Sequence, residues 1–293
     1  MRVFVTGGTG LIGSAVVGEL ISHGHTVLGL ARSDESARAL EAAGAEPHRG
    51  TLADLDAVRA GAAGAEGSVH LAFANDFSSA EAVRQAVEEE SAAVRAIGEL
   101  YLGRDRPFVV CSGTPWAEGR PSTEADPLLI VEDSPLTGRG RTVTAVLELA
   151  EKGLRASAVR LPRTVHNQGR GGFAGLLAEM ARRSGICRYP ADGSQRWPAV
   201  HALDAAALFR LALESAPAGG VWHAVADEGD TVRDIAGVIG RRLGVPVEEV
   251  PAESFGPLGA IFSLDQPSSS AYTRRTLGWE PTHPSLLDDL GNL

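Results

Sequence analysis

The stretch Thr6-Gly-Gly-Thr-Gly-Leu-Ile-Gly13 decides the fold of this chain of 293 residues. It follows the apolar, β-branched run Arg2–Thr6 and opens a helical pattern over residues 11–23. Its spacing is Gly-x-Gly-x-x-Gly from Gly8 and Gly-x-x-Gly-x-x-Gly from Gly7. Glycine suits a tight strand-to-helix turn whose backbone approaches a pyrophosphate, and the free N–H groups of the helix N-terminus then bind its oxygens. We therefore predict a dinucleotide-binding loop, with contacts from Gly7, Gly10, Leu11, Ile12 and Gly13.

Outward from this loop, short apolar runs alternate with helical patterns. The expected strands are residues 2–6, 26–31, 45–48, 67–73, 107–112 and 154–161. The expected helices between them are residues 11–23, 33–43, 54–61, 79–102 and 142–152. Such alternation, with strands that are apolar almost throughout, is typical of a parallel sheet covered by helices on both faces. The sequence therefore predicts an α/β fold with a doubly wound parallel sheet.

The second half of the chain is less regular. Residues 173–183 and 231–243 show helical periodicity, and Asp204 is placed to cap a helix over residues 205–213. Four prolines fall within the last forty residues, so we expect short helices and loops there.

Composition excludes several classes of protein. Hydrophobic content of 44% is too high for a disordered chain, and no run reaches the roughly 18 apolar residues of a membrane span. A formal net charge of −10 without a basic block argues against nucleic acid as a partner. Cys111 and Cys187 have no metal-site or disulfide-scaffold spacing, and His23 and His25 lack a third ligand, so no metal is predicted. Without a signal peptide at the N-terminus, the expected location is cytoplasmic.

The end of the second expected strand bears on the choice of cofactor. An acidic residue about 20 positions after the glycine loop would bind the ribose 2′-hydroxyl of NAD. Here the strand ends on Arg32 and Ser33, whose guanidinium and hydroxyl suit a 2′-phosphate. We therefore predict NADP as the cofactor, while Asp34, one or two positions later, keeps NAD possible.

Five motifs together resemble the extended short-chain dehydrogenase/reductase superfamily, in particular its NAD-dependent epimerase/dehydratase-like members. They are TGGTGLIG at residues 6–13, VHLAF at 69–73, VVCSGT at 109–114, VRLPRTVH at 159–166 and WPAVHALDAA at 197–206. The resemblance implies a Rossmann sheet of about seven strands with a smaller C-terminal substrate domain. It implies a dinucleotide-binding domain over residues 1–163 and 198–226, and a substrate-binding domain over residues 164–197 and 227–293.

The same resemblance implies cofactor contacts at three places beyond the glycine loop. The exit of the fourth strand, Leu71, Ala72 and Phe73, would border the cofactor ribose. The exit of the sixth strand, Leu161 and Pro162, would meet the nicotinamide. Leu52 lies in the segment that approaches adenine, where Thr51 stands in place of the usual aspartate.

The superfamily's catalytic Tyr-x-x-x-Lys pair has no match in this sequence. The residues four positions after the three tyrosines, Tyr101, Tyr189 and Tyr272, are Asp105, Gly193 and Thr276. The single lysine, Lys152, precedes Gly153 at the far end of the helix that should carry the pair, where it suits the terminal carbonyls better than a ribose. The chain therefore resembles an atypical subgroup that keeps the cofactor loop and lacks the pair.

Other side chains are candidates for the missing chemistry. Ser112 and Thr114 match the superfamily's hydroxyl position and would polarise a carbonyl. His166, just after the sixth strand, has a suitable ordinary pKa for proton transfer, although it could instead hydrogen-bond a loop backbone. Asp76, just after the fourth strand, could titrate higher when partly buried, or could simply cap the following helix. Arg139 could stabilise an oxyanion or could lie in solvent.

The function that this pattern favours is an NADP-dependent oxidoreductase acting on a carbonyl or hydroxyl of a small molecule, with non-standard acid and base residues. Two alternatives remain open. One is an enzyme of the same fold without net redox, such as an isomerase, dehydratase or cyclase. The other is a non-catalytic NADP-binding sensor. The predicted partner is a small-molecule substrate, and no oligomeric state is predicted.

Overall fold

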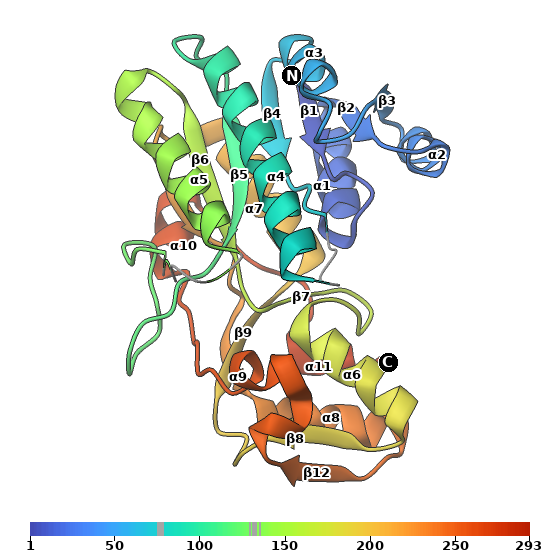
Figure 1. Ribbon diagram of the computed structural model, residues 1–293. Coiled ribbons are helices and arrows are strands. Elements are labelled where there is room, and N and C mark those ends of the chain that lie inside the picture. The colour runs from blue at the N-terminus through green and yellow to red at the C-terminus, as the bar shows by residue number, and fades with distance from the viewer. Residues whose placement is uncertain (75–78, 129, 131–133, 135) are drawn as a thin grey trace. The chain divides into compact units, whose positions relative to one another are not determined.

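A seven-stranded sheet lies at the centre of the first part of the molecule in the computed structural model, which describes residues 1–74, 79–128, 130, 134 and 136–293 (Figure 1). The strands run in the order β10-β6-β5-β4-β1-β2-β3, and the pairs from β3 through β5 are parallel. The predicted doubly wound Rossmann sheet is confirmed. Its strands are β1 (Arg2–Thr6), β2 (Thr26–Ala31), β3 (Glu46–Arg49), β4 (Gly67–His70), β5 (Phe108–Gly113), β6 (Ala156–Leu161) and β10 (Val221–His223).

Helices cover this sheet on both faces. Figure 1 shows α4 and α5 in front of the sheet and α7 behind it. Between α3, α4, α5 and the sheet lies a core that includes the fully buried Phe4, Ile97 and Phe108. The helices are α1 (Leu11–Ser22), α2 (Asp34–Ala42), α3 (Leu55–Ala63), α4 (Ala80–Tyr101), α5 (Thr137–Glu148), the 3₁₀ helix η1 (Leu149–Lys152) and α7 (Ala202–Ser215).

Local signals in the sequence set several helix ends. Ser33 caps α2 in a capping box with Ser36, and the Ser79 hydroxyl accepts the N–H of Ala82 at the start of α4. Gly153 closes η1 with a φ of 86°, a conformation that costs glycine little. The predicted glycine cap after Lys152 is thus confirmed.

The chain divides into two compact units. The first comprises residues 1–112, 128–160 and 206–222, and the second comprises residues 113–127, 161–205 and 223–293. The second unit holds a three-stranded sheet, β11-β9-β7, and a pair of parallel strands, β12-β8. Its elements are β7 (Thr164–His166), α6 (Gly172–Ser184), β8 (Cys187–Pro190), β9 (Arg196–His201), β11 (Asp227–Thr231), α8 (Val232–Leu243), β12 (Val247–Val250), the 3₁₀ helix η2 (Ala252–Leu258), α9 (Gly259–Phe262), α10 (Ala271–Leu277) and α11 (Leu286–Leu290).

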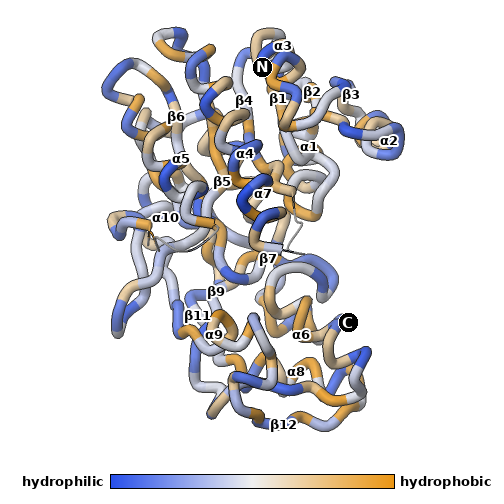
Figure 2. Tube along the Cα trace, viewed as in Figure 1, coloured by the Kyte–Doolittle hydropathy of each residue, from blue (hydrophilic) through white to orange (hydrophobic). Residues whose placement is uncertain are grey.

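The second unit has its own apolar core. Trp197, Ile239 and Phe262 are fully buried there, and the Trp197 and Phe262 rings lie 5.2 Å apart between centroids. Helix α6 has one apolar face, on which Ala174, Leu177, Ala178 and Ala181 are buried, and Figure 2 shows this helix mostly in orange. That the two units bind dinucleotide and substrate, respectively, stays a prediction.

The predicted helix cap at Asp204 is wrong. Helix α7 begins at Ala202, so Asp204 lies in its first turn, 2% exposed. Its carboxylate accepts the backbone N–H groups of Thr282 and His283 at 2.9 and 3.1 Å. The acidic side chain thus anchors the C-terminal segment instead of starting the helix.

None of the helices in the described parts of the chain combines the length and the apolar character that a membrane crossing requires.

Candidate functional site

A cavity of about 590 Å³ opens where the strand order of the sheet reverses, between β1 and β4. Ligands of doubly wound sheets bind at this switch point, outside the carboxyl ends of the strands. Four segments of the first unit line it: the glycine loop after β1, the end of β2 with α2, residues 50–53, and residues 71–74 after β4. Thr9, Ser36 and Glu89 also line it, although none of these three was predicted to be a site residue.

Two glycines of the loop have no room for a side chain. Gly7 has a φ of 74°, and a Cβ there would stand 2.7 Å from the backbone N of Ala72. A Cβ on Gly13 would stand 1.9 Å from the carbonyl oxygen of Gly7. Helix α1 starts at Leu11 after Gly10, with no side chain capping its first N–H groups. This bare helix N-terminus beside a cavity fits the pyrophosphate of a dinucleotide.

The exit of β4 is fixed to β1 through Thr6. The backbone N–H groups of Leu71 and Ala72 both donate to the Thr6 hydroxyl at 3.3 Å. The same hydroxyl also forms a hydrogen bond with His70 Nδ1, at 2.9 Å. The cavity wall formed by Leu71, Ala72 and Phe73 is therefore held in register with the glycine loop.

A buried ion pair stands behind the same wall. Arg139, on α5, donates to both carboxylate oxygens of Glu90, on α4, at 2.7 and 2.8 Å. The Arg139 guanidinium also lies 4.1 Å from the ring centroid of Phe73, which lines the cavity. Burial pushes the pKa of Glu90 upward, but His70 and Arg139 outweigh it and hold that pKa below its ordinary value. Arg139 is thus a fixed cation and not a free surface arginine.

Arg32 and Ser33, the two residues predicted to contact the 2′-phosphate, differ in whether other residues already bind them. Arg32 is exposed, lines the cavity and has no ion-pair or hydrogen-bond partner among the described residues. The Ser33 hydroxyl accepts the N–H of Ser36 at 3.2 Å in the capping box. The carboxylate of Asp34 is engaged by Arg49 at 2.6 Å. The free charge at this part of the cavity is therefore positive, which suits a phosphate better than a ribose hydroxyl.

The candidate hydroxyls of Ser112, near the end of β5, and of Thr114, just after it, have no hydrogen-bond partner among the described residues. Ser112 is half-buried, and Thr114 is only 7% exposed, with its Oγ1 buried. The backbone of Thr114 is fixed, because its N–H donates to Leu161 at 2.9 Å and its carbonyl accepts from Gln266 at 2.6 Å. A buried, positioned hydroxyl without a partner is what a carbonyl-polarising group requires. The neighbouring Cys111 is no nucleophile, because burial raises the pKa of its thiol to about 12.

His166 lies inside the second unit, 1% exposed. Its Nδ1 faces Asp289 at 2.9 Å, and that carboxylate also accepts the backbone N–H groups of Gln168 and Gly169. The ring makes an edge contact with His201, at 5.4 Å between centroids. The described structure therefore gives His166 a carboxylate partner rather than the loop backbone, and its part in proton transfer stays a prediction.

The cavity is not lined by Ser112, Thr114, His166, Leu161 or Pro162. Asp76 lies outside the described residues. Leu161 is the last residue of β6 and is half-buried, and Pro162 follows it and is buried. Their contact with the nicotinamide stays a prediction. In the described parts of the chain, no group of three His, Cys, Asp or Glu residues could hold a metal ion.

Comparison with known proteins agrees with this architecture. The model of the NAD-dependent epimerase/dehydratase family matches residues 3–224, so the chain belongs to that family. An uncharacterised protein of Schizosaccharomyces pombe is 43% identical over 100% of this chain and 99% of its own length. The 3-diazoavenalumate denitrifying reductase of a Streptomyces species is 29% identical over 99% of each chain. The structure of UDP-glucose 4-epimerase from Thermotoga maritima superposes with a TM-score of 0.77 at 21% identity, covering 100% of this chain and 97% of the epimerase.

Proposed function

As a member of that family, the chain is, we propose, an NADP-dependent oxidoreductase that acts on a carbonyl or hydroxyl group of a small molecule. The observation that carries the proposal is the cavity at the switch point, which combines a bare helix N-terminus with the guanidinium of Arg32, a cation that pairs with no described residue. The reductase named among the relatives supports the redox part of the proposal.

Each segment of the cavity has a distinct part in holding the cofactor. The N–H groups of Leu11 and Ile12 would hold the pyrophosphate, and the Arg32 guanidinium would hold the 2′-phosphate. Leu52 packs beside the adenine. The wall of Leu71, Ala72 and Phe73, held by Thr6 and Arg139, packs beside the nicotinamide ribose.

NADPH held in this cavity would supply the hydride that reduces a carbonyl group of the substrate. The hydroxyls of Ser112 and Thr114 donate hydrogen bonds to the carbonyl oxygen and stabilise the negative charge that develops on it. A proton must then reach that oxygen. His166 and Asp76 are the two candidate donors of this proton, and His166 is 1% exposed with its Nδ1 2.9 Å from Asp289.

The test is consumption of NADPH by the purified protein with a panel of ketones, aldehydes and enones. Substrate-dependent oxidation of NADPH is the expected result. Ser112→Ala should lower kcat/KM by about 10²-fold, the effect of losing one donor to an oxyanion. Thr144→Val is the matched control, because the exposed Thr144 hydroxyl only donates to the carbonyl of Gly140 on its own helix. A broad panel without NADPH consumption above background would overturn the proposal.

One sequence feature favours a second candidate, an enzyme of this fold without net redox. The Tyr-x-x-x-Lys pair that supports hydride transfer in the superfamily is missing. In that case substrate turns over while the absorbance of NADPH stays at its starting value. Stoichiometric oxidation of NADPH excludes this candidate, and it also excludes a sensor that binds the dinucleotide without turnover.

A further inference from the structure

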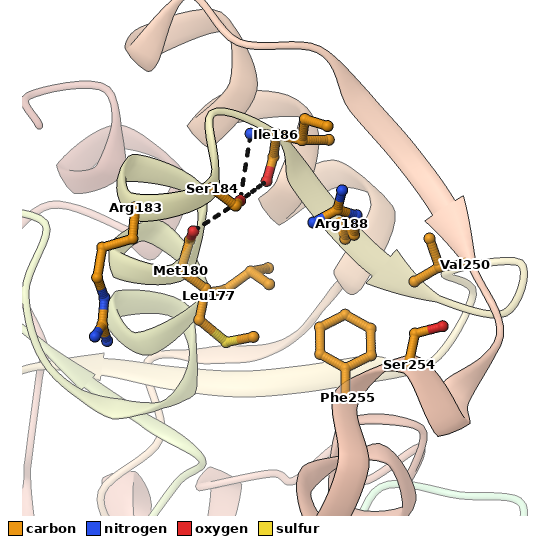
Figure 3. A pocket seen from close by; sticks show the side chains of 9 residues that line it. All are labelled: Leu177, Met180, Arg183, Ser184, Ile186, Arg188, Val250, Ser254 and Phe255. Carbon is orange, nitrogen blue, oxygen red and sulfur yellow. Dashed lines mark hydrogen bonds between the residues drawn. The ribbon is translucent and has the colours of Figure 1, made fainter.

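A second cavity, of about 360 Å³, lies wholly within the second unit. It is formed by the C-terminal half of α6, the start of β8, the end of β12 and the start of η2, and Figure 3 shows the side chains around it. Its volume is within the range of small-molecule sites, which is about 300–1,000 Å³. It lies within the segments predicted to bind substrate, but none of the individual side chains proposed above to contact the dinucleotide, the carbonyl group or the proton lines it.

The floor of this cavity is apolar. Leu177 is 1% exposed and Phe255 is 8% exposed, and Met180, Ile186 and Val250 are half-buried beside them. Figure 3 shows Leu177 and Met180 on the side of α6 that faces the ring of Phe255. An unbranched thioether next to an aromatic ring adapts readily to a bound apolar group. The floor thus suits an alkyl chain or an aromatic ring.

The charges that line the cavity are all positive. Arg188 and Arg183 are its two charged lining residues, and no acidic residue lines it. Figure 3 places Arg188 between Ile186 and Val250, directly beside the apolar floor. Its Nε lies 3.8 Å from the Glu248 carboxylate, longer than the about 2.7–2.9 Å of a charge-assisted hydrogen bond. No hydrogen bond to a described residue uses the Arg188 guanidinium, so its donors remain available.

The polar group at the turn before β8 is already occupied. The hydroxyl of Ser184 donates to the carbonyl oxygens of Met180 and Ile186, both at 2.9 Å, and so fixes the turn that presents Ile186 to the cavity. Specificity for a ligand therefore depends on the cation beside the floor and not on this hydroxyl.

We infer that this cavity binds a small amphiphilic carboxylate, with its apolar part on the floor formed by Leu177, Met180 and Phe255 and its carboxylate on Arg188. An apolar floor provides affinity in proportion to the area that it removes from water, and one guanidinium selects the charged end. The inference does not depend on the redox chemistry of the first unit.

The test is calorimetric titration of the full chain with decanoate, below its micelle concentration, and with decanol as the uncharged probe. Decanoate should bind in a 1:1 ratio, and decanol about tenfold more weakly, which is the effect of one partly exposed charge-assisted hydrogen bond. Arg188→Gln should weaken decanoate by the same factor and leave decanol unchanged. Glu248→Gln should tighten decanoate, because the carboxylate that competes for Arg188 is removed.

Arg182→Gln is the matched control, since Arg182 is an exposed arginine of α6 that does not line the cavity. Met180→Trp, checked for folding by its circular dichroism and unfolding midpoint, fills the cavity and should abolish binding of both probes. Absence of decanoate binding, equal binding of decanoate and decanol, or equal losses in Arg188→Gln and Arg182→Gln would overturn the inference. Because Arg188→Gln is a substitution near the surface, the test holds even if Met180→Trp fails to fold.

Discussion

A methyl group on Gly13 would collide with the carbonyl oxygen of Gly7, because its carbon would stand 1.9 Å from that atom. We predict that Gly13→Ala lowers the free energy of unfolding by about 1–3 kcal/mol, as overpacking does, and removes NADPH binding because the loop moves. Gly18→Ala on the same helix is the control: a Cβ there meets nothing within 4 Å, and alanine should stabilise the helix by about 0.5–1 kcal/mol. Urea unfolding and NADPH titration measure both effects. Equal behaviour of the two variants would contradict the close approach.

Arg32 is the single side chain on which the preference for NADP depends. Arg32→Asp should weaken NADPH binding at least about tenfold, because it replaces a charge-assisted hydrogen bond to a phosphate with a repulsion. NADH binding should stay the same or tighten. Arg38→Asp on α2 makes the same change of charge at an exposed residue that does not line the cavity, and should have little effect. Equal affinities of the wild type for NADPH and NADH would show that Arg32 does not select the cofactor.

Among the helices, α4 and α5 are joined by the Glu90–Arg139 pair. Glu90→Gln leaves the Arg139 cation, whose side chain is 33% exposed, without its counter-charge, and should cost about 2 kcal/mol of unfolding free energy. Since the folded state lowers the pKa of Glu90, this contribution is present above the ordinary pKa of 4.5 and is lost as the pH falls below it. Urea unfolding at pH 7.5 and pH 4 measures both. The exposed Glu88, replaced by Gln, is the control on the same helix.

Strand β11 carries a carboxylate with the opposite behaviour. Burial, followed by the charges of Asp227, Asp234 and Asp288, raises the pKa of Asp230 to about 6. A raised folded pKa favours the protonated form, so the stability that Asp230 contributes falls as the pH rises from about 4 through 6. Asp230→Asn should therefore stabilise the protein by about 1 kcal/mol at pH 7.5, after allowance for solvent screening, and by little near pH 4. Melting temperatures across this range test the sign, with the exposed Asp56→Asn as control; stabilisation at pH 4 alone would contradict it.

At the scale of the whole molecule, the family model matches residues 3–224. The features of this fold that depend on neighbouring residues were predicted from the sequence. The glycine loop, the alternating strands and the Gly153 cap depend on neighbouring residues, so they can be recognised from a few positions each. The pairs that hold the walls together could not be recognised in this way. Glu90 and Arg139 lie 49 residues apart, and His166 and Asp289 lie 123 apart, so only the fold brings them together.

Three short strands of the second unit were also missed, for a related reason, whereas the short helices expected in the last forty residues are present. Strands β7, β8 and β12 have three or four residues each, too few to show a period of two against their surroundings. Asp204 was misassigned because a capping aspartate and one that anchors a distant segment look the same in sequence. The strands that pair with β7, β8 and β12, and the N–H groups that Asp204 binds, come from distant parts of the sequence.

We propose that this chain moves a hydride from NADPH to a small carbonyl compound. The most direct measurement uses NADPH deuterated at the transferring position of the nicotinamide, with the carbonyl panel and mass spectrometry of the products. We expect a reduced product that carries one deuterium, with NADP⁺ formed in equal amount. The Ser112→Ala variant should lose this transfer of the label. Turnover that yields an unlabelled product while the cofactor stays reduced would contradict it.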